Sequence, residues 1–412
     1  MTQPIPQGYK QSEIGVIPED WEALKVADVA YFSGGAQPPR STFLFQPKNG
    51  YIRLIQIRDY KSSDFETYIP EELARKKCNE TDIMIGRYGP PIFQILRGIK
   101  GAYNVALIKA IPKQNIEQNY LYYFLKSDTL FELMEVLSQR SSGQTGVELP
   151  ALKAYPIALP PKHEQTAIAN ALSDVDALIS VLESLIAKKQ AIKTATMQQL
   201  LTGKTRLPQF AHHPDGTAKG YQQTELGLIP EDWGVMNLGE VAHINMGQSP
   251  SSACYNDKAI GLPLVQGNAD ITNRKTIVRN YTSQITKTAK KGDFILSVRA
   301  PVGEIAKADF DCCIGRGVCS LKYKNDYLYH WLIGFETEWD KFSKGSTFDS
   351  INSDELRLIQ LILPSDEEQT AIAQILSDMD EEIQALETRL SKTKQIKQGM
   401  MQVLLTGKVR LV

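Results

Sequence analysis

The feature that most constrains this 412-residue sequence is an internal repeat. The segment Gly8–Trp21, GYKQSEIGVIPEDW, returns as GYQQTELGLIPEDW at Gly220–Trp233. A second segment, Glu164–Leu207, returns at Glu368–Leu411 with 25 identical residues over 44 aligned positions. A period of roughly 200 residues is too long for a solenoid and indicates duplication of a whole domain with its connector. The chain is therefore expected to fold as two pseudo-equivalent halves.

The segments between the repeats, about 31 to 158 and about 243 to 362, are far more divergent. They share only traces, such as Gly50–Gln56 beside Gly261–Gln266 and Glu80–Met84 beside Lys291–Ile295. A common frame that carries two different modules predicts one architecture with two different surfaces. The expected fold is mixed α/β (α+β), with two modules separated by two long antiparallel helices that form a coiled coil. The predicted domain bounds are 1–158, 159–207, 208–362 and 363–412.

The second repeat predicts one long helix in each half. Its apolar residues recur in alternating steps of four and three, the spacing of a coiled-coil seam, and Ile192 and Ile396 extend both stripes. Prolines precede both helices, Ser365 and Glu368 have the spacing of a capping box, and Thr-Gly-Lys supplies a glycine stop after each. Because the stripes match, each helix is the expected partner of the other; two unrelated surface helices are the alternative. The predicted seam residues are Ile168, Leu172, Val175, Ile179, Leu182, Ile186, Ile372, Leu376, Met379, Ile383, Leu386 and Leu390.

Sequence motifs for catalysis, metal binding or cofactor binding are missing. Leu201–Thr205 resembles the end of a phosphate-binding loop, but Gln198 stands where that loop needs a glycine, so a helix C-cap is favoured. Tyr88-Gly89-Pro90-Pro91 lacks the polar residue of an adenine-methyltransferase motif. His212-His213 lies in a turn-rich connector without partners at helical spacing, and the other histidines are isolated. We expect no catalytic residues, no metal ligands and no cofactor in this chain.

Cysteine number and overall charge narrow the cellular context. Five cysteines lack the paired C-x2-C spacing of a zinc site, which favours reduced, structural thiols. The N-terminus lacks the features of a signal peptide and no apolar run is long enough to span a membrane, so a cytoplasmic location is expected. The 46 basic and 47 acidic residues give a net charge of −1, so any binding of nucleic acid must rely on local patches.

Two groups of motifs have both a structural and a functional interpretation. In the Ile-Pro-Glu-Asp-Trp segments, Pro-Glu-Asp favours a turn while Ile and Trp favour burial, so structural anchoring is preferred over catalysis. Arg299–Gly303 and Cys313–Val318 place arginine beside small residues in predicted strand-to-loop turns. These turns serve either the fold or contact with DNA, and the sequence leaves both open.

In combination, these motifs resemble the specificity subunit of type I restriction-modification systems over nearly the whole chain. The resemblance rests on the Ile-Pro-Glu-Asp-Trp segments, Ser297–Gly303, Ile314–Gly317, the Glu-Gln-Thr-Ala-Ile-Ala helix starts and the Leu-Leu-Thr-Gly-Lys ends. It implies that each module is a target recognition domain that reads one half of an asymmetric, bipartite DNA site, while the helices set the spacing. It also implies partners: double-stranded DNA, two DNA adenine methyltransferase subunits and, in the larger complex, restriction subunits. S-adenosylmethionine, ATP and Mg are expected only in those partner subunits.

Direct readout of the major groove needs side chains with paired donors and acceptors. Module one carries Arg87-Tyr88-Gly89-Pro90-Pro91 where module two carries Arg299-Ala300-Pro301-Val302-Gly303, so individual contacts are not expected to correspond. The candidates in module one are Arg40, Arg58, Arg87, Tyr88, Arg97, Lys100, Arg140, Ser141, Gln144 and Thr145. Those in module two are Gln248, Ser249, Asn256, Asn268, Arg274, Lys275, Arg299, Arg316, Lys344, Ser346 and Thr347.

Two other functions are compatible with parts of the pattern. A nuclease or methyltransferase with a fused coiled coil would need a cofactor or metal motif that the sequence lacks. A coiled-coil adaptor that organises protein partners without reading DNA would account for the helices. It would not account for two divergent modules of similar size on equivalent connectors.

Overall fold

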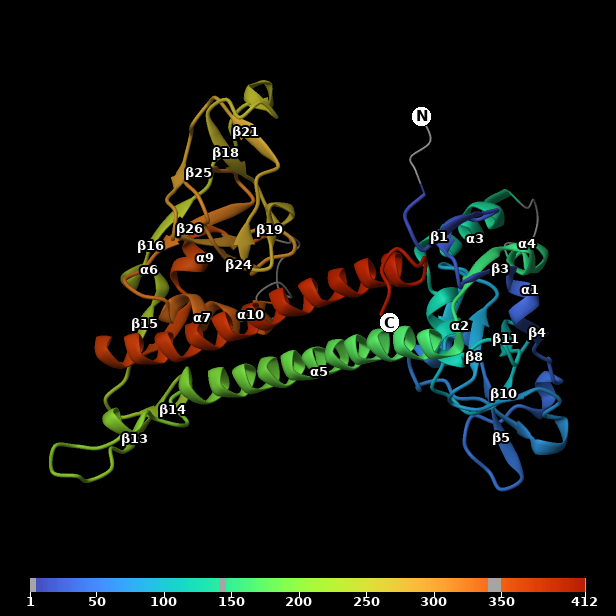
Figure 1. Ribbon diagram of the computed structural model, residues 1–412. Helices are drawn as coiled ribbons and strands as arrows, with labels where there is room; N and C mark the ends of the chain where they lie inside the picture. The colour runs from blue at the N-terminus through green and yellow to red at the C-terminus, as the bar shows by residue number, and fades with distance from the viewer. Residues whose placement is uncertain (1–4, 141–145, 340–349, 412) are drawn as a thin grey trace. The chain divides into compact units, whose positions relative to one another are not determined.

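The computed structural model describes residues 5–140, 146–339 and 350–411, and the chain forms two compact units (Figure 1). Unit 1 comprises Met1–Leu182 and Arg389–Val412, and unit 2 comprises Glu183–Thr388. The predicted long helices are α5 (Lys162–Leu200) and α10 (Asp366–Leu404), each 39 residues long. Each unit thus combines one module with the first part of one long helix and the last part of the other.

Unit 1 contains two four-stranded sheets, ordered β4-β11-β8-β9 and β6-β5-β10-β7, and the two-stranded pairs β1–β2 and β3–β12. Its strands are β1 (Tyr9–Ser12), β2 (Gly15–Pro18), β3 (Glu22–Lys25), β4 (Ala30–Gly34), β5 (Tyr51–Ile55), β6 (Tyr68–Pro70), β7 (Lys77–Cys78), β8 (Ile83–Gly86), β9 (Gln94–Leu96), β10 (Gly101–Tyr103), β11 (Leu107–Pro112) and β12 (Pro156–Leu159). Its helices besides the long ones are α1 (Val26–Val29), η1 (Arg40–Thr42), η2 (Ile57–Tyr60), η3 (Glu71–Leu73), α2 (Gln118–Leu125), α3 (Asp128–Arg140) and α4 (Leu149–Ala154).

Unit 2 contains a six-stranded sheet, β16-β26-β23-β24-β20-β19, a five-stranded sheet, β17-β21-β18-β25-β22, and the pairs β13–β14 and β15–β27. Its strands are β13 (Tyr221–Thr224), β14 (Gly227–Pro230), β15 (Gly234–Asn237), β16 (His243–Met246), β17 (Tyr255–Asn256), β18 (Leu262–Val265), β19 (Ile271–Thr272), β20 (Lys275–Thr276), β21 (Asn280–Thr282), β22 (Thr288–Ala289), β23 (Phe294–Ser297), β24 (Ile305–Lys307), β25 (Cys312–Ile314), β26 (Val318–Lys322) and β27 (Gln360–Leu363). Its shorter helices are η4 (Pro208–Phe210), α6 (Leu238–Val241), η5 (Ser252–Cys254), η6 (Asn268–Asp270), α7 (Tyr327–Gly334), η7 (Glu336–Glu338) and α9 (Ser353–Arg357).

The two divergent modules share one strand plan, as their sparse sequence traces predict. Strand β5 runs parallel to β10 in unit 1, and β18 runs parallel to β25 in unit 2. Before β8, Asp82 Oδ2 accepts a hydrogen bond from the Asn79 amide at 2.7 Å, and before β23, Asp293 Oδ2 accepts one from the Lys290 amide at 2.8 Å. The traces therefore mark strand starts and ends that both modules need. Both units mix helix and sheet, which confirms the expected fold class.

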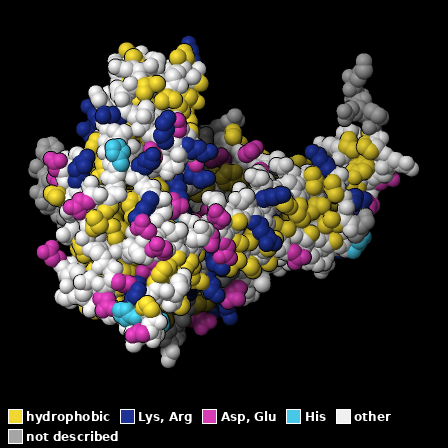
Figure 2. All heavy atoms as spheres, turned by 90° about the vertical axis from the view of Figure 1, so that its left-hand side faces the viewer, with side chains coloured by type: hydrophobic (Ala, Val, Ile, Leu, Met, Phe, Trp, Pro, Cys, Tyr) yellow, Lys and Arg dark blue, Asp and Glu magenta, His cyan; other side chains and the backbone are white. Residues whose placement is uncertain are grey.

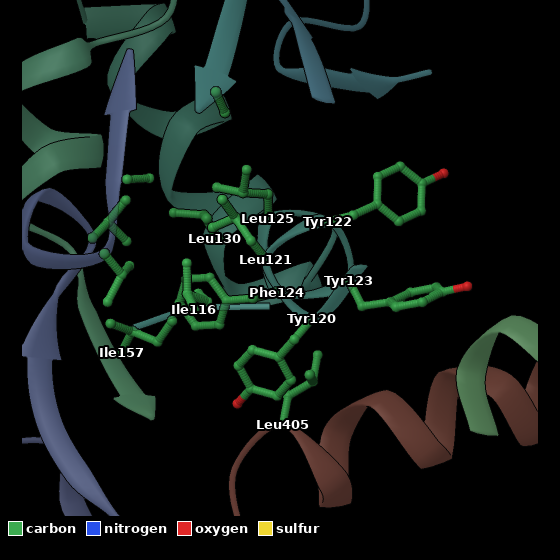
Figure 3. Packing of buried hydrophobic residues seen from close by; sticks show 14 of the residues in the cluster. Ile116, Tyr120, Leu121, Tyr122, Tyr123, Phe124, Leu125, Leu130, Ile157 and Leu405 are labelled. Carbon is green, nitrogen blue, oxygen red and sulfur yellow. The ribbon is translucent and has the colours of Figure 1, made fainter. Parts of the chain in front are cut away.

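Each long helix begins by packing into the core of its own module. In unit 1, Ile168 and Leu172 are fully buried in the cluster that contains Tyr120 of α2. Leu404 and Leu405, from the end of the other long helix, join the same cluster, and Figure 3 shows Leu405 against the Tyr120 ring. Ile372 and Leu376 occupy the corresponding places in the core of unit 2. The first residues of each predicted seam thus pack against the module, and the later ones are left to contact the other long helix.

Within each unit the two long helices run antiparallel and are joined by equivalent ion pairs. In unit 1, Lys397 Nζ lies 2.6 Å from Asp176 Oδ1. In unit 2, Lys193 Nζ lies 2.5 Å from Asp380 Oδ1, and Lys189 contacts Glu382 one turn away. The antiparallel helix pair is therefore repeated in both units, as the matched stripes predict.

The prediction that Ile192 and Ile396 extend the seam is wrong. These side chains are 41% and 49% exposed, respectively, whereas Leu182 and Ile186 are buried. Val175, Ile179, Met379, Leu386 and Leu390 are half-buried, and Ile383 is buried. An α-helix has 3.6 residues per turn, so a stripe with a 3.5-residue period drifts around the helix unless the helices supercoil.

The Ile-Pro-Glu-Asp-Trp segment of unit 1 anchors the end of the chain to the start of α5. The buried Trp21 donates from its indole nitrogen to Glu164 Oε2 at 2.9 Å. The Arg410 guanidinium donates to both carboxylate oxygens of Glu164, at 2.6 and 2.7 Å, and to both of Asp20, at 2.9 Å. The hydrogen bonds from Arg410 hold the pKa of Asp20 below its usual value. The structure confirms the anchoring interpretation of this motif.

The same cluster recurs in unit 2 with a more deeply buried arginine. Trp233 donates to Glu368 Oε2 at 3.0 Å, and Arg206 forms two hydrogen bonds with Glu368 and two with Asp232. Burial raises the pKa of Asp232, but hydrogen bonds from Arg206 and Lys219 outweigh it and lower the pKa to about 2. The predicted capping box is half formed: the Glu368 amide donates to Ser365 Oγ at 3.3 Å, while the Glu368 carboxylate binds the tryptophan and the arginine.

Where the modules meet the helices, unit 2 has a buried histidine at the position of a tyrosine in unit 1. In α2, Tyr123 donates to Asp176 Oδ2 at 2.9 Å. In α7, His330 Nε2 lies 3.0 Å from Ser377 Oγ, and Nδ1 lies 3.9 Å from Asp380 Oδ2. Burial, followed by the nearby Lys193, lowers the pKa of His330 to about 4.

We predict that the stability of unit 2 depends on this histidine below neutral pH. The pKa of His330 is about 4 in the folded chain and about 6.5 in the unfolded chain. Above pH 6.5 the histidine is neutral in both states, so its titration does not change the free energy of unfolding. As the pH falls from 6.5 to 4, the unfolded state gains the proton first and up to about 3 kcal/mol is lost. Urea denaturation at pH 7.5, 6 and 5 would measure this loss. His330→Gln should remove that part of the pH dependence, and an unchanged profile would contradict the assignment.

No helix in the described residues is both long and apolar enough to cross a membrane.

Candidate nucleic-acid interface

In unit 2, four loops meet at the edge where β16, β18, β23 and β25 all end. We call this set, residues 247–250, 266–268, 298–303 and 315–317, the loop edge of unit 2. The Gly247 amide donates to Val318 O at 3.0 Å and the Gln248 amide to Ile314 O at 2.9 Å. The Val298 amide donates to Gly317 O at 2.9 Å, which ties the third loop to the fourth. Backbone bonds therefore hold the loops together, while the side chains of Gln248, Arg299 and Arg316 are exposed.

Unit 1 has an equivalent loop edge, residues 35–38, 56, 87–92 and 104–106. The Gly35 amide donates to Leu107 O at 3.0 Å and the Asn104 amide to Ile55 O at 3.1 Å. The Arg87 amide donates to Ala106 O at 2.8 Å, as Val298 does to Gly317. A Cβ on Gly35 would lie 1.9 Å from Asn104 O, and one on Gly247 would lie 2.2 Å from Gly315 O. Both units thus need glycine where the first and fourth loops cross.

The same backbone positions carry different side chains in the two loop edges. Equivalent backbone hydrogen bonds place Gln248 and Ser249 of unit 2 where unit 1 has Ala36 and Gln37. They also place Arg316 of unit 2 where unit 1 has Val105. The same bonds match Arg87 with Val298, one residue away from the sequence alignment of Arg87 with Arg299. The two arginines therefore occupy different positions, and their contacts are not expected to correspond. Ser249 Oγ accepts a hydrogen bond from the Arg316 amide at 3.1 Å, which fixes the turn and leaves the Arg316 side chain exposed. One frame therefore presents two different sets of side chains, mostly polar at these positions in unit 2 and mostly apolar in unit 1.

The structure brings some of the predicted DNA-contacting residues to these edges. In unit 1 they are Arg87 and Tyr88, whose guanidinium and ring centroid are 5.2 Å apart. In unit 2 they are Gln248, Ser249, Asn268, Arg299 and Arg316. Arg58 lies in η2, the short helix that begins directly after Gln56. Arg40 is exposed in η1. Their contacts with DNA stay predictions.

Other predicted residues lie elsewhere or are engaged within the fold. Arg97 and Lys100 lie at the opposite end of β8 and β9, where the Arg97 guanidinium stacks 3.9 Å from the Tyr122 ring centroid. Arg274 forms a bidentate pair with Glu336, next to Lys275. Asn256 donates to Ile260 O at 3.0 Å within its own turn. Ser141, Gln144, Thr145, Lys344, Ser346 and Thr347 lie outside the described residues, as does the side chain of Arg140 at the end of α3.

Charged side chains of both signs are mixed on one face of the molecule, and the described residues hold no cluster of metal ligands. Figure 2 shows basic side chains interspersed with acidic ones on the face that it presents. Among the described residues, no group of three His, Cys, Asp or Glu side chains could hold a metal. All five cysteines are free, and burial raises the pKa of Cys312 and Cys319 to about 12. These thiols therefore stay protonated in the core.

Comparison with known proteins assigns the family. The profile of the type I restriction modification DNA specificity domain matches residues 18–193 and again residues 230–398. The chain belongs to this family. The MjaX type I restriction enzyme specificity subunit of Methanocaldococcus jannaschii is 30% identical, with 98% of this chain and 97% of that protein covered. The MjaVIII specificity subunit of the same organism is 27% identical over 98% of this chain and 96% of its own length.

A solved relative has the same fold as this member of the specificity family. The type I restriction-modification S subunit from M. genitalium superposes with a TM-score of 0.62 at 14% identity, over 93% of this chain and 96% of its own. Each of the two profile matches spans one repeated frame with the module inside it. The specificity domain is thus present twice.

The sequence missed several residues of the loop edges in this family member. Gln56 and Gln266 each follow a strand of the parallel pair in their unit. The backbone amide of Gln56 donates to Asp59 Oδ2 at 2.8 Å, and that of Gln266 donates to Asp270 Oδ2 at 2.7 Å. Both glutamines end the traces that the modules share, which was the available signal. Asn104 had no such signal, because it reaches the edge only through the pairing of β10 with β5.

Proposed function

We propose that this chain is the DNA-recognition subunit of a type I restriction-modification complex, in which each unit reads one half of a bipartite site. The observation that carries the proposal is one backbone frame with two different loop edges. Arg316, Gln248 and Ser249 present donors and acceptors of the kind that distinguish base pairs in the major groove. Val105, Ala36 and Gln37 at the matching positions of unit 1 would read another sequence, so the whole site is asymmetric.

The repeated frame supports the proposed roles of the helices and partners. Two continuous helices of 39 residues, each about 58 Å long at 1.5 Å per residue, would set the distance between the half-sites. Because the frame occurs twice, it offers two equivalent docking places, one for each of two DNA adenine methyltransferase subunits. Restriction subunits would join in the larger complex.

The chain itself is proposed to be non-catalytic and cytoplasmic. The sequence offers no motif for S-adenosylmethionine, ATP or Mg, so these would be bound by the partner subunits. Adenine methylation should appear only when the methyltransferase subunit is added. Turnover of DNA by the purified chain alone would contradict this division of labour.

We predict that exchanging residues 31–158 for another family module changes only one half of the recognised sequence. The segments that border this module, 8–30 and 159–207, belong to the shared frame and hold the module in the same way as its counterpart. Methylation-aware sequencing of DNA from cells that carry the variant and the methyltransferase would report both halves. A change in both halves at once would show that the modules do not read independently. DNA binding lost in every module variant, with methyltransferase assembly retained, would favour a protein-organising adaptor.

A further inference from the structure

Two phenylalanine side chains in the described part of the chain are largely exposed, and both belong to unit 1. Phe45 is 73% exposed and Phe65 is 64% exposed. The segments that carry them run side by side, because the Leu44 amide donates to Tyr68 O at 2.9 Å and the Tyr68 amide to Leu44 O at 2.8 Å. Large apolar rings are normally buried, so their exposure on two neighbouring segments suggests a function.

Phe65 differs from Phe45 in having an arginine against its ring. The Arg58 guanidinium carbon lies 5.7 Å from the centroid of Phe65, and Arg58 Nη2 donates to Phe65 O at 3.4 Å. The pair forms an exposed aromatic face with a cation held against it. Nucleic acids offer both partners for such a pair, since bases stack on aromatic rings and phosphates bind guanidinium groups.

This pair is tied directly to the loop edge of unit 1. Helix η2, which carries Arg58, begins immediately after Gln56. Gln56 Nε2 donates to Thr67 Oγ1 at 3.1 Å, so the loop that carries Phe65 is fastened to the same residue. Thr67 is itself buried and its neighbour Glu66 pairs with Arg53 at 2.8 Å. The fold therefore presents Phe65 beside the proposed reading surface.

We propose that Phe65 inserts between stacked bases at the half-site read by unit 1, while Arg58 pairs with the adjacent phosphate. This inference rests on the proposed DNA-reading function. Proteins that bend DNA use apolar side chains in this way, wedging them into a base step to unstack it. The half-site would then be selected partly by how readily one of its base steps opens, in addition to its pattern of donors and acceptors.

Unit 2 has no exposed phenylalanine in its described residues. After η6 it continues into the β19–β20 hairpin, and the exposed large apolar side chains nearby are aliphatic. They include Ile277 and Val278 after the hairpin, and Ile285, whose neighbour Thr286 donates a hydrogen bond to Gln248 O at the loop edge. Arg274 at that hairpin is bound to Glu336. The strongest deformation of the DNA is therefore expected at the half-site read by unit 1, because aliphatic side chains offer no ring on which a base can stack.

The test uses the full chain with its methyltransferase subunit and a duplex that carries the methylated site identified by sequencing. 2-Aminopurine is placed at successive steps of each half-site, because its fluorescence rises when stacking is lost. For the wild-type complex, we expect a rise at one step of the unit 1 half-site. Phe65→Ala should abolish the rise and weaken binding about tenfold or more, whereas Phe65→Leu should keep part of both. Arg58→Ala should weaken binding and reduce its dependence on salt.

Tyr31→Ala is the matched control. Tyr31 is 62% exposed and has the Lys113 ammonium 4.6 Å from its ring centroid, but it lies at the start of β4, at the far end from the loop edge. Its replacement should leave binding and fluorescence unchanged. Wild-type affinity and fluorescence in Phe65→Ala would overturn the proposal. It would also be overturned if Phe65→Ala lost methyltransferase assembly but kept its affinity for DNA. If the wild-type complex binds no specific DNA, the proposed function itself fails.

Discussion

Replacing Arg410 with alanine is expected to destabilise unit 1 while leaving unit 2 intact, although Arg410 is almost the last residue of the chain. The Glu164 carboxylate is completely buried, and Arg410 supplies two of its hydrogen bonds. Removing one partner of a buried ion pair leaves an uncompensated charge, which costs about 3 kcal/mol or more. Arg206→Ala should destabilise unit 2 in the same way but by more, because the Arg206 side chain is only 6% exposed.

Hydrogen exchange measured by mass spectrometry would assign each effect to a unit. Arg410→Ala should speed exchange in peptides around residues 9–18, and Arg206→Ala in peptides around 221–230, where the equivalent hairpins lie. Adding Glu164→Gln to Arg410→Ala should recover part of the lost stability, because it removes the unpaired charge. Equal exchange in both units for either single variant would show that the clusters do not act separately.

The sequence was informative wherever a residue has the same local role in both halves. Tryptophan, aspartate and glutamate of the anchoring clusters recur because each half needs the same buried hydrogen bonds. Gly203 and Gly407, both with φ of +70°, recur because each long helix ends in the same left-handed turn. A repeat inside one chain thus allowed the frame to be predicted without any relative.

The loop edges could not be predicted in the same way. Gln248, Gln266 and Arg316 are far apart in the sequence and meet only because β16, β18 and β25 end at one side of the module. The presence of an arginine in a module was a misleading guide to contact with DNA, since Arg97 stacks on Tyr122 and Arg274 pairs with Glu336. Phe65 was missed because an apolar residue in a sequence is first assigned to the core. Exposure is set by tertiary packing, which no local pattern reports.

Lengthening both long helices by one heptad is expected to change the spacing of the recognised DNA site. Inserting seven residues after Leu182 and seven after Leu386 keeps the contacts on both sides of the insertions. Asp176 stays opposite Lys397 in unit 1 and Asp380 stays opposite Lys193 in unit 2, because each pair lies wholly outside the inserted turns. A heptad that continues the apolar stripe also keeps the helix faces in phase.

The inserted turns lengthen the helices by about 10 Å, which corresponds to about three base pairs of B-DNA. Three base pairs also rotate one half-site by about 100°, so either the spacer grows by three or the complex stops binding. Methylation profiling distinguishes these outcomes. A heptad inserted after Leu182 alone should disrupt assembly, because the two ion pairs can then no longer form in one register. Activity at the original spacing in the double insertion would show that the helices hold partners without measuring the distance between the half-sites.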